Sequence, residues 1–335
     1  MFDLPTIWAV LLAVAVLAYV ILDGFDLGVG ILFRAARGED DRATMMNTIA
    51  PVWDGNETWL ILGGGGLMAA FPRAYAIIMP ALYMPLILML LALVFRGVAF
   101  EYRWRTERWK GLWDRGFFLG SLVAAVMQGI MLGAMIQGVE VDATGRGYGG
   151  GWFDWLTPFT IMSGLGLAAG YALLGATWLI WKTEGDLRAR CYGYARRLAL
   201  VLLAFIALVS LWTPFTHEAI MDRWFGWPHI VLTAPVPLLV LAAAWWLFHG
   251  LARAKDPVPF AASLCLFVLS YVGLGISFFP YAVPRTITYA EAAAPDSSLA
   301  FLLVGASVLL PIILAYTAYA YWVFRGKVRP GEGYH

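Results

Sequence analysis

Apolar runs of about 20 residues recur along the whole chain, and they constrain its fold more than any other feature. A helix of this length crosses the roughly 30 Å hydrocarbon core of a bilayer. Of the 335 residues, 61% are hydrophobic and 13% are charged, whereas an ordinary soluble domain has about 25% charged residues. The sequence therefore predicts an all-α polytopic membrane protein, with residues 1–335 forming a single integral membrane domain.

About nine transmembrane helices are expected, arranged as two four-helix bundles plus one peripheral helix. The second run is short and rich in glycine, and every connection is too short to hold a separate domain. The expected spans are residues 7–33, 56–71, 74–98, 117–138, 158–181, 198–215, 230–250, 260–280 and 298–324.

Basic residues are divided unequally between the two ends of these spans. All but four of the 23 Lys and Arg residues fall at connections that follow odd-numbered spans, an alternation that is lost if the second span is removed. Because short cytoplasmic loops retain Lys and Arg, the N-terminus is expected outside and the C-terminus inside. The four exceptions are Arg73, Arg146, Arg223 and Arg285.

Carboxylates lie in or against the first three apolar runs. An ionisable side chain at membrane depth costs at least about 2.5–3.5 kcal/mol, which favours a functional role such as a proton relay. Asp23 lies roughly 24 Å along the first span, at a rise of about 1.5 Å per residue, and Asp26 follows on the neighbouring face. Asp54 and Glu57 open the second span, and Glu101 ends the third. All five are therefore expected near the cytoplasmic side, where they predict a proton path.

Structural roles remain open for several of these acids. Asp54 could be the N-cap of the second helix, and the capping-box spacing of Glu57 favours a structural role for that residue. An ion pair with a neighbouring arginine is an equally good interpretation of Glu101. No basic residue occurs among residues 1–33, which favours either function or burial against a charged partner for Asp23 and Asp26.

Neighbouring residues are predicted to support the proton path. Asn56, Glu57 and Arg96 are the candidates for this supporting role. Gly24 and Gly28 form a G-x-x-x-G pair, which allows another helix to approach closely. A partner helix is therefore expected to pack beside Asp23 and Asp26.

Patterns for cofactor binding are weak in this chain. A b-type haem needs an axial His or Met at membrane depth, whereas His217, His229, His249 and His335 lie at connections or chain ends. Two cysteines provide neither a disulfide framework nor a zinc cluster, and no metal site is predicted. The net charge of +1 gives no indication of nucleic-acid binding. The chain alone is not expected to perform redox or hydrolytic chemistry.

Three segments resemble the signature regions of subunit II of cytochrome bd quinol oxidases: DGFDLGVG from Asp23, NTIAPVWDGNETWL from Asn47 and VFRGVAFEYRWR from Val94. The stretch PIILAYTAYAYWVFRGKV from Pro311 is also similar, so the resemblance covers the whole length. The compact length is similar to that of the cyanide-insensitive branch of this family.

The resemblance implies a haem-free subunit that packs against a haem-bearing subunit I in the bacterial cytoplasmic membrane. Subunit I binds two b-type haems and haem d, oxidises quinol near the outer face and reduces dioxygen to water. Carried over by motif, Asp54, Asp23 and Asp26 supply cytoplasmic protons to the oxygen site. Glu101 stands where the family motif usually has Asp, which keeps a carboxylate but lengthens its reach.

Further partners implied by the resemblance are small single-helix accessory subunits and membrane lipids. A structural quinone or lipid could occupy subunit II, but the sequence assigns no residues to such a pocket.

Two other functions fit the residues. A self-contained proton-coupled transporter would also show intramembrane carboxylates, although near a midplane site between paired broken helices. If the chain is a purely structural assembly subunit, neutralising its acids is expected to lower only the yield of the assembled complex.

Overall fold

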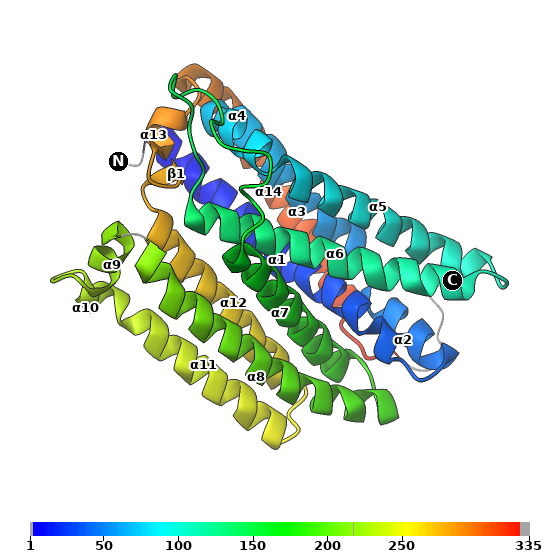
Figure 1. The fold of residues 1–335 in the computed structure, drawn as a ribbon. Coiled ribbons are helices and arrows are strands. Elements are labelled where there is room, and N and C mark those ends of the chain that lie inside the picture. The colour runs from blue at the N-terminus through cyan, green and yellow to red at the C-terminus, as the bar shows by residue number, and fades with distance from the viewer. Residues whose placement is uncertain (1–2, 217, 329–335) are drawn as a thin grey trace.

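The computed structural model describes residues 3–216 and 218–328 as an assembly of long helices (Figure 1). Within these residues, eight helices are long and apolar enough to cross a membrane. They are α1 (Leu4–Leu32), α5 (Tyr83–Arg105), α6 (Lys110–Gln137), α7 (Pro158–Lys182), α8 (Gly185–Thr216), α11 (Pro235–Ala252), α12 (Pro257–Phe278) and α14 (Asp296–Val323).

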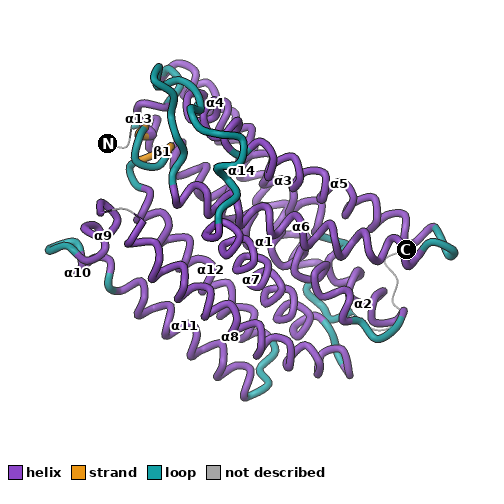
Figure 2. Tube along the Cα trace, in the orientation of Figure 1, coloured by secondary structure: helices purple, strands orange, loops and turns teal. Residues whose placement is uncertain are grey.

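Most of the shorter elements lie at the two ends of the bundle, whereas α3 packs along α1. Figure 2 shows the strands confined to one short hairpin, near the N-terminal end of α1. This end also carries α4 and α13, whereas α2 lies at the opposite end (Figure 1). The shorter elements are η1 (Phe33–Ala35), α2 (Glu39–Ile49), α3 (Trp53–Ala70), α4 (Pro72–Ala81), α9 (Glu218–Phe225), α10 (Ile230–Thr233), β1 (Tyr281–Val283), the antiparallel β2 (Ile287–Thr288) and α13 (Tyr289–Ala292).

The long helices form two neighbouring groups with one helix at the periphery. In one group α1 packs against α3 and α6, and α6 packs against α5. In the other α7 packs against α8 and α12, and α12 packs against α11. The groups meet where α7 contacts both α1 and α6, while α14 touches α1 and α3 through few residues. The predicted all-helical membrane architecture is confirmed.

Glycines determine how closely the two groups approach. A Cβ atom on Gly28 would lie 1.8 Å from the carbonyl oxygen of Tyr171, and one on Gly175 would lie 2.3 Å from the carbonyl carbon of Gly28. A Cβ on Gly24 would meet the Tyr171 ring at 2.7 Å. Because only glycine fits at these points, α7 is the helix that packs beside Asp23 and Asp26.

The second and third expected spans differ in detail from the helices. The second lies within α3, which has 18 residues and carries Asp54 and Glu57. The third is divided, because residues 74–81 belong to α4 and a separate helix, α5, begins at Tyr83. Pro80 and Pro85 lie on either side of this break. Since proline has no backbone N–H to donate and its ring disturbs the preceding turn, a straight helix through residues 74–98 is unfavourable.

Candidate functional site

The buried acids of α1 lie beside a buried arginine from α5. Asp23, Asp26 and Arg96 are all fully inaccessible to solvent. Arg96 Nη1 lies 2.6 Å from Glu57 Oε1 on α3 and 3.6 Å from Asp23 Oδ1. The charged partner of the α1 carboxylates therefore comes from a distant part of the chain, and three helices meet at one guanidinium.

Aromatic rings enclose the Arg96 guanidinium. Its central carbon lies 5.6 Å from the ring centroid of Trp53 and 5.9 Å from that of Phe117, distances at which cation–π attraction operates. If Asp23, Asp26 and Glu57 were all ionised, this apolar surrounding would hold two negative charges in excess of the single positive charge. Burying unpaired charge is strongly unfavourable, so the cluster is suited to taking up and releasing protons.

Asn56 on α3 connects this cluster to one further helix, α14. Its Nδ2 donates to Asp26 Oδ2 over 2.7 Å and to the carbonyl oxygen of Leu22 over 3.3 Å. The hydroxyl of Tyr321, near the end of α14, donates to Asn56 Oδ1 over 2.9 Å. Asn56 therefore fixes the Asp26 carboxylate and is itself fixed by α14.

A cavity of about 390 Å³ opens beside Asn56, between the start of α3, the end of α5 and the end of α14. Asp54 and Glu101 line it, together with Asn56 and Tyr321. Both acids are exposed, and their carboxylates lie close enough to repel each other. The cavity thus joins two accessible carboxylates to the polar pair that contacts buried Asp26.

Comparison with known proteins identifies the family. A family model described as cytochrome bd terminal oxidase subunit II matches residues 4–324. The chain belongs to this family. Cytochrome bd-I ubiquinol oxidase subunit 2 of Escherichia coli (strain K12) is 34% identical over 358 residues, which cover 96% of this chain and 94% of that protein. Cytochrome bd ubiquinol oxidase subunit 2 of Bacillus subtilis (strain 168) is 30% identical, with 99% of both chains covered.

A solved structure shares the fold of this bd oxidase subunit. The bd oxidase from Geobacillus thermodenitrificans matches with a TM-score of 0.76 at 17% identity, over 96% of this chain and 98% of that chain. The predictions of a bd-type oxidase subunit II and of a multi-pass bacterial membrane protein are confirmed.

The capping interpretation of Asp54 in this bd oxidase subunit is wrong. Val52 is the N-cap of α3 and no side chain caps the helix, so Asp54 lies inside the first turn. The chain enters α3 through a tight turn in which the Val52 amide bonds to the carbonyl oxygen of Ile49, and this turn starts the helix two residues early. The capping-box role of Glu57 fails with it, because Glu57 points to Arg96 instead.

The ion-pair interpretation of Glu101 is also wrong for the described residues, where none of the ion pairs includes it. Two of the neighbouring arginines, Arg96 and Arg103, bond to other carboxylates. Arg103 is fully buried and bonds to Asp114 Oδ1 over 2.6 Å and to Glu39 Oε2 over 2.7 Å. Arg96 is engaged with Glu57 and Asp23. Glu101 lines the cavity instead.

Sequence reasoning missed four polar residues near the acids of this subunit: Tyr19, Gln128, Tyr171 and Tyr321. Each lies on a helix long enough to span a membrane, and the first three are buried. Tyr19 could have been found from its position one helical turn before Asp23. The other three come from distant helices, and only the packing of those helices brings them to the site.

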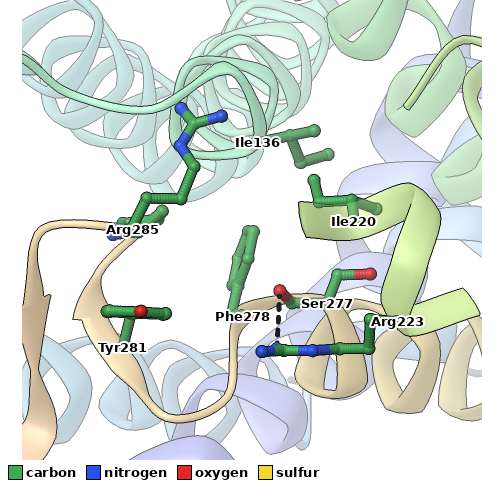
Figure 3. Close-up of a pocket in the computed structure, with 8 residues that line it drawn as sticks. Ile136, Ile220, Arg223, Ser277, Phe278, Tyr281 and Arg285 are labelled. Atoms are coloured by element: carbon green, nitrogen blue, oxygen red, sulfur yellow. Dashed lines mark hydrogen bonds between the residues drawn. The ribbon is translucent and has the colours of Figure 1, made fainter. Parts of the chain in front are cut away.

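A second, smaller hollow at the opposite end of the subunit is a structural feature (Figure 3). It measures about 30 Å³ and is lined by Arg223 and Arg285. Arg223 Nη1 donates to the carbonyl oxygens of Ile276 and Ser277 over 3.1 and 3.3 Å, and Arg285 donates to that of Gln137. Both arginines satisfy carbonyl groups at helix C-termini, where cations are favourable.

Proposed function

We propose that this subunit conducts protons from the cytoplasm toward the oxygen-reducing site of a haem-bearing subunit I, within a quinol oxidase. The observation that carries the proposal concerns Asn56, which lines the 390 Å³ cavity together with Asp54 and Glu101 and donates a hydrogen bond to the buried carboxylate of Asp26 on α1. Two relatives are named as ubiquinol oxidase subunits, which supports quinol as the reductant used by the complex.

The route begins at Asp54 and Glu101 in the cavity. A carboxyl group can bind a proton and release it, which an amide cannot do at neutral pH. In this scheme Asp54 and Glu101 collect protons, Asp26 and Asp23 carry them through the bundle, and Asn56 holds Asp26 in place. Arg96 and Glu57 set the charge around Asp23. Turnover then draws protons inward as oxygen reduction consumes them.

The charge distribution supports a cytoplasmic position for the cavity. The basic residues gather at the end of the bundle that carries α2, and this excess is typical of a cytoplasmic face. Three of the four arginines expected on the other face bond to backbone carbonyls: Arg223 and Arg285 at helix ends, and Arg73 to Gly145 over 2.9 Å. Their presence outside therefore has a structural reason.

Charge separation follows from this arrangement without a pump. When bound in subunit I, two haems b and haem d would supply electron transfer and oxygen reduction. Quinol oxidation at the outer face releases protons there, whereas protons for water are taken from inside through this chain. Each turnover thereby contributes to the proton motive force.

The test is the Asp54→Asn variant in the intact, haem-loaded oxidase. Quinol-dependent oxygen uptake should fall about ten-fold. This is less than the roughly 100-fold or greater effect of losing a sole acid–base group, because Glu101 remains in the cavity. Asp54→Asn combined with Glu101→Gln should fall further.

A matched control is Asp296→Asn. Asp296 also lies exposed in the first turn of a long helix, α14, but at the end away from the cavity. Its turnover should equal that of the parent. Near-normal turnover in Asp54→Asn with full haem content would refute proton entry, and loss of haem would indicate a role in assembly instead.

A further inference from the structure

Three buried polar side chains form a hydrogen-bonded array that links α7, α6 and α1. The Tyr171 hydroxyl on α7 donates to Gln128 Oε1 on α6 over 2.8 Å. Gln128 Nε2 then donates to the hydroxyl oxygen of Tyr19 on α1, also over 2.8 Å. Tyr171 is fully buried, and Tyr19 and Gln128 are 5% and 9% exposed.

The array ends at Tyr19, near the carboxylate of Asp23. Tyr19 lies four residues before Asp23 on α1, a spacing that places both side chains on one face of the helix. The Tyr19 hydroxyl is near enough to the Asp23 carboxylate for the two groups to influence each other, although no hydrogen bond of standard geometry joins them. Its oxygen accepts from Gln128, and Gln128 Oε1 already accepts from Tyr171. A rotation of the Tyr19 hydroxyl would therefore direct its hydrogen to Asp23 without breaking either bond of the array.

Asp23 needs such a donor. Its nearest cation, Arg96, is 3.6 Å away and forms its shorter contact with Glu57. Within the described part of the chain, neither Asp23 oxygen receives a hydrogen bond of standard geometry. A buried carboxylate without donors is strongly unfavourable, so a rotation of the Tyr19 hydroxyl toward it would stabilise the ionised form.

We propose that Tyr19 is a positioning residue for proton transfer at Asp23. When Asp23 gives up its proton, Tyr19 donates a hydrogen bond to the resulting carboxylate and keeps its own proton. Gln128 and Tyr171 hold the Tyr19 oxygen in place. This inference rests on the proposed proton path and extends it, because it assigns a function to a buried array on the side of Asp23 away from the cavity.

Other charged groups also face Asp23 and must be kept constant in a test. They are Asp26 on α1, Glu57 on α3 and Arg96 on α5, while Tyr171 faces it from α7. A change of Tyr19 to Phe alters none of these groups and keeps the aromatic ring. Its effect therefore reports the hydroxyl alone.

Infrared difference spectroscopy of the intact oxidase tests the hydrogen bond directly. The antisymmetric carboxylate stretching band of ionised Asp23 is assigned by its loss in Asp23→Asn. Tyr19→Phe should shift this band to higher wavenumber and lower kcat roughly ten-fold, as expected for one lost hydrogen bond to a charged group. The KM for quinol should not change.

Two further variants make the test specific. Tyr171→Phe keeps the ring beside Gly24 but removes the donor to Gln128, and it should give a smaller band shift in the same direction. Tyr271→Phe is the matched control. The Tyr271 hydroxyl on α12 donates to the backbone oxygen of Ala13 over 2.8 Å, and Ala13 lies on α1, the helix that carries Tyr19. This control variant should leave the band and kcat unchanged.

An unshifted Asp23 band and parental kcat in both Tyr19→Phe and Tyr171→Phe would overturn the inference and make the array a helix-packing contact. Failure of the proton path would look different. Normal turnover in Asp54→Asn would remove the path, whereas the band shift in Tyr19→Phe would still measure the contact between Tyr19 and Asp23.

Discussion

At the scale of single residues, Arg96 organises the acidic site. It is fully buried, contacts carboxylates from α1 and α3, and lies against the rings of Trp53 and Phe117. A buried ion pair is a modest source of net stability, yet removal of one partner leaves an uncompensated charge. The main effect of removing Arg96 would therefore be to leave buried carboxylates without a compensating positive charge.

We expect Arg96→Leu to destabilise the subunit by about 3–5 kcal/mol, the usual effect of breaking a buried ion pair. A marked fall in the Tm of the purified oxidase would measure this. Arg105→Leu is the matched control, since Arg105 lies exposed near the end of the same helix, and its Tm should be parental. Equal Tm values for the two variants would contradict the central role of Arg96.

At the scale of elements, the contact between α1 and α7 tolerates no side chain at Gly28. A methyl group there would overlap the carbonyl oxygen of Tyr171, and overpacking of this kind costs about 1–3 kcal/mol. Gly28→Ala should therefore lower the Tm of the oxidase. Gly64→Ala on α3 should leave the Tm unchanged or slightly higher, because nothing lies within 4 Å of its Cβ position and alanine favours a helix.

The peripheral helix α14 is held at its end by the tail that follows it. Lys327 Nζ donates to Asp256 Oδ2 over 2.7 Å, and the Val328 amide donates to the carbonyl oxygen of Lys182 over 2.8 Å. Lys182 Nζ in turn donates to the carbonyl oxygen of Gly326 over 2.9 Å. These contacts fix the wall of the cavity to α7 and to the connection between α11 and α12.

Asp256 makes this attachment sensitive to acid. Burial tends to raise its pKa, but hydrogen bonds from Arg188, Lys327 and Tyr192 outweigh burial and hold the pKa below its ordinary value. A lowered pKa stabilises the folded state above the unfolded value of about 3.9, and this contribution is lost as pH falls through the folded value. The tail should therefore detach below about pH 4.

Hydrogen exchange at the Val328 amide measures this detachment. The protection factor of this amide, which compares its exchange rate with that of an unstructured amide at the same pH, should fall on acidification in the parent protein and should be low at every pH in Asp256→Asn. Slow exchange in Asp256→Asn at neutral pH would show that the carboxylate does not hold the tail.

At the scale of the whole molecule, the proposed proton path leads inward from the cytoplasm only if the α2 end faces the cytoplasm. Single cysteines in a background of Cys191→Ser and Cys265→Ser can test this. A membrane-impermeant thiol reagent should label Ser298→Cys in intact cells and should label Glu107→Cys only after the membrane is opened. The reverse pattern would invert the orientation and make the path an outward-facing one.

Sequence patterns predict the broad architecture because lipid imposes a simple rule. Runs of sufficient length and apolarity must become helices, and this identified most of the long elements. The break at Leu82 is not predicted by the sequence pattern, since prolines within an apolar run do not by themselves decide whether a membrane helix bends or ends. Asp23 and Asp26 were recognised because acids stand out in an apolar run.

The contacts of those acids could not be derived in the same way. Arg96 is more than 70 residues from Asp23 in sequence, and its place at the end of an apolar run fits an ion pair with Glu101 as well as a role beside the acids of the first run. Only the packing of α5 against α6, and of α6 against α1, turns it inward. Gln128 and Tyr321 reach the site by similarly long-range packing, which no local pattern records.

The loose attachment of α14 has a consequence for how the subunit is made. The cavity wall that carries Tyr316, Thr317 and Tyr321 belongs to the last of the described helices, so it leaves the ribosome after every other helix around the acids. During synthesis the entrance to the buried carboxylates has no wall on that side. We expect the proposed route to become enclosed only when this last helix inserts, so that proton entry begins with the finished chain.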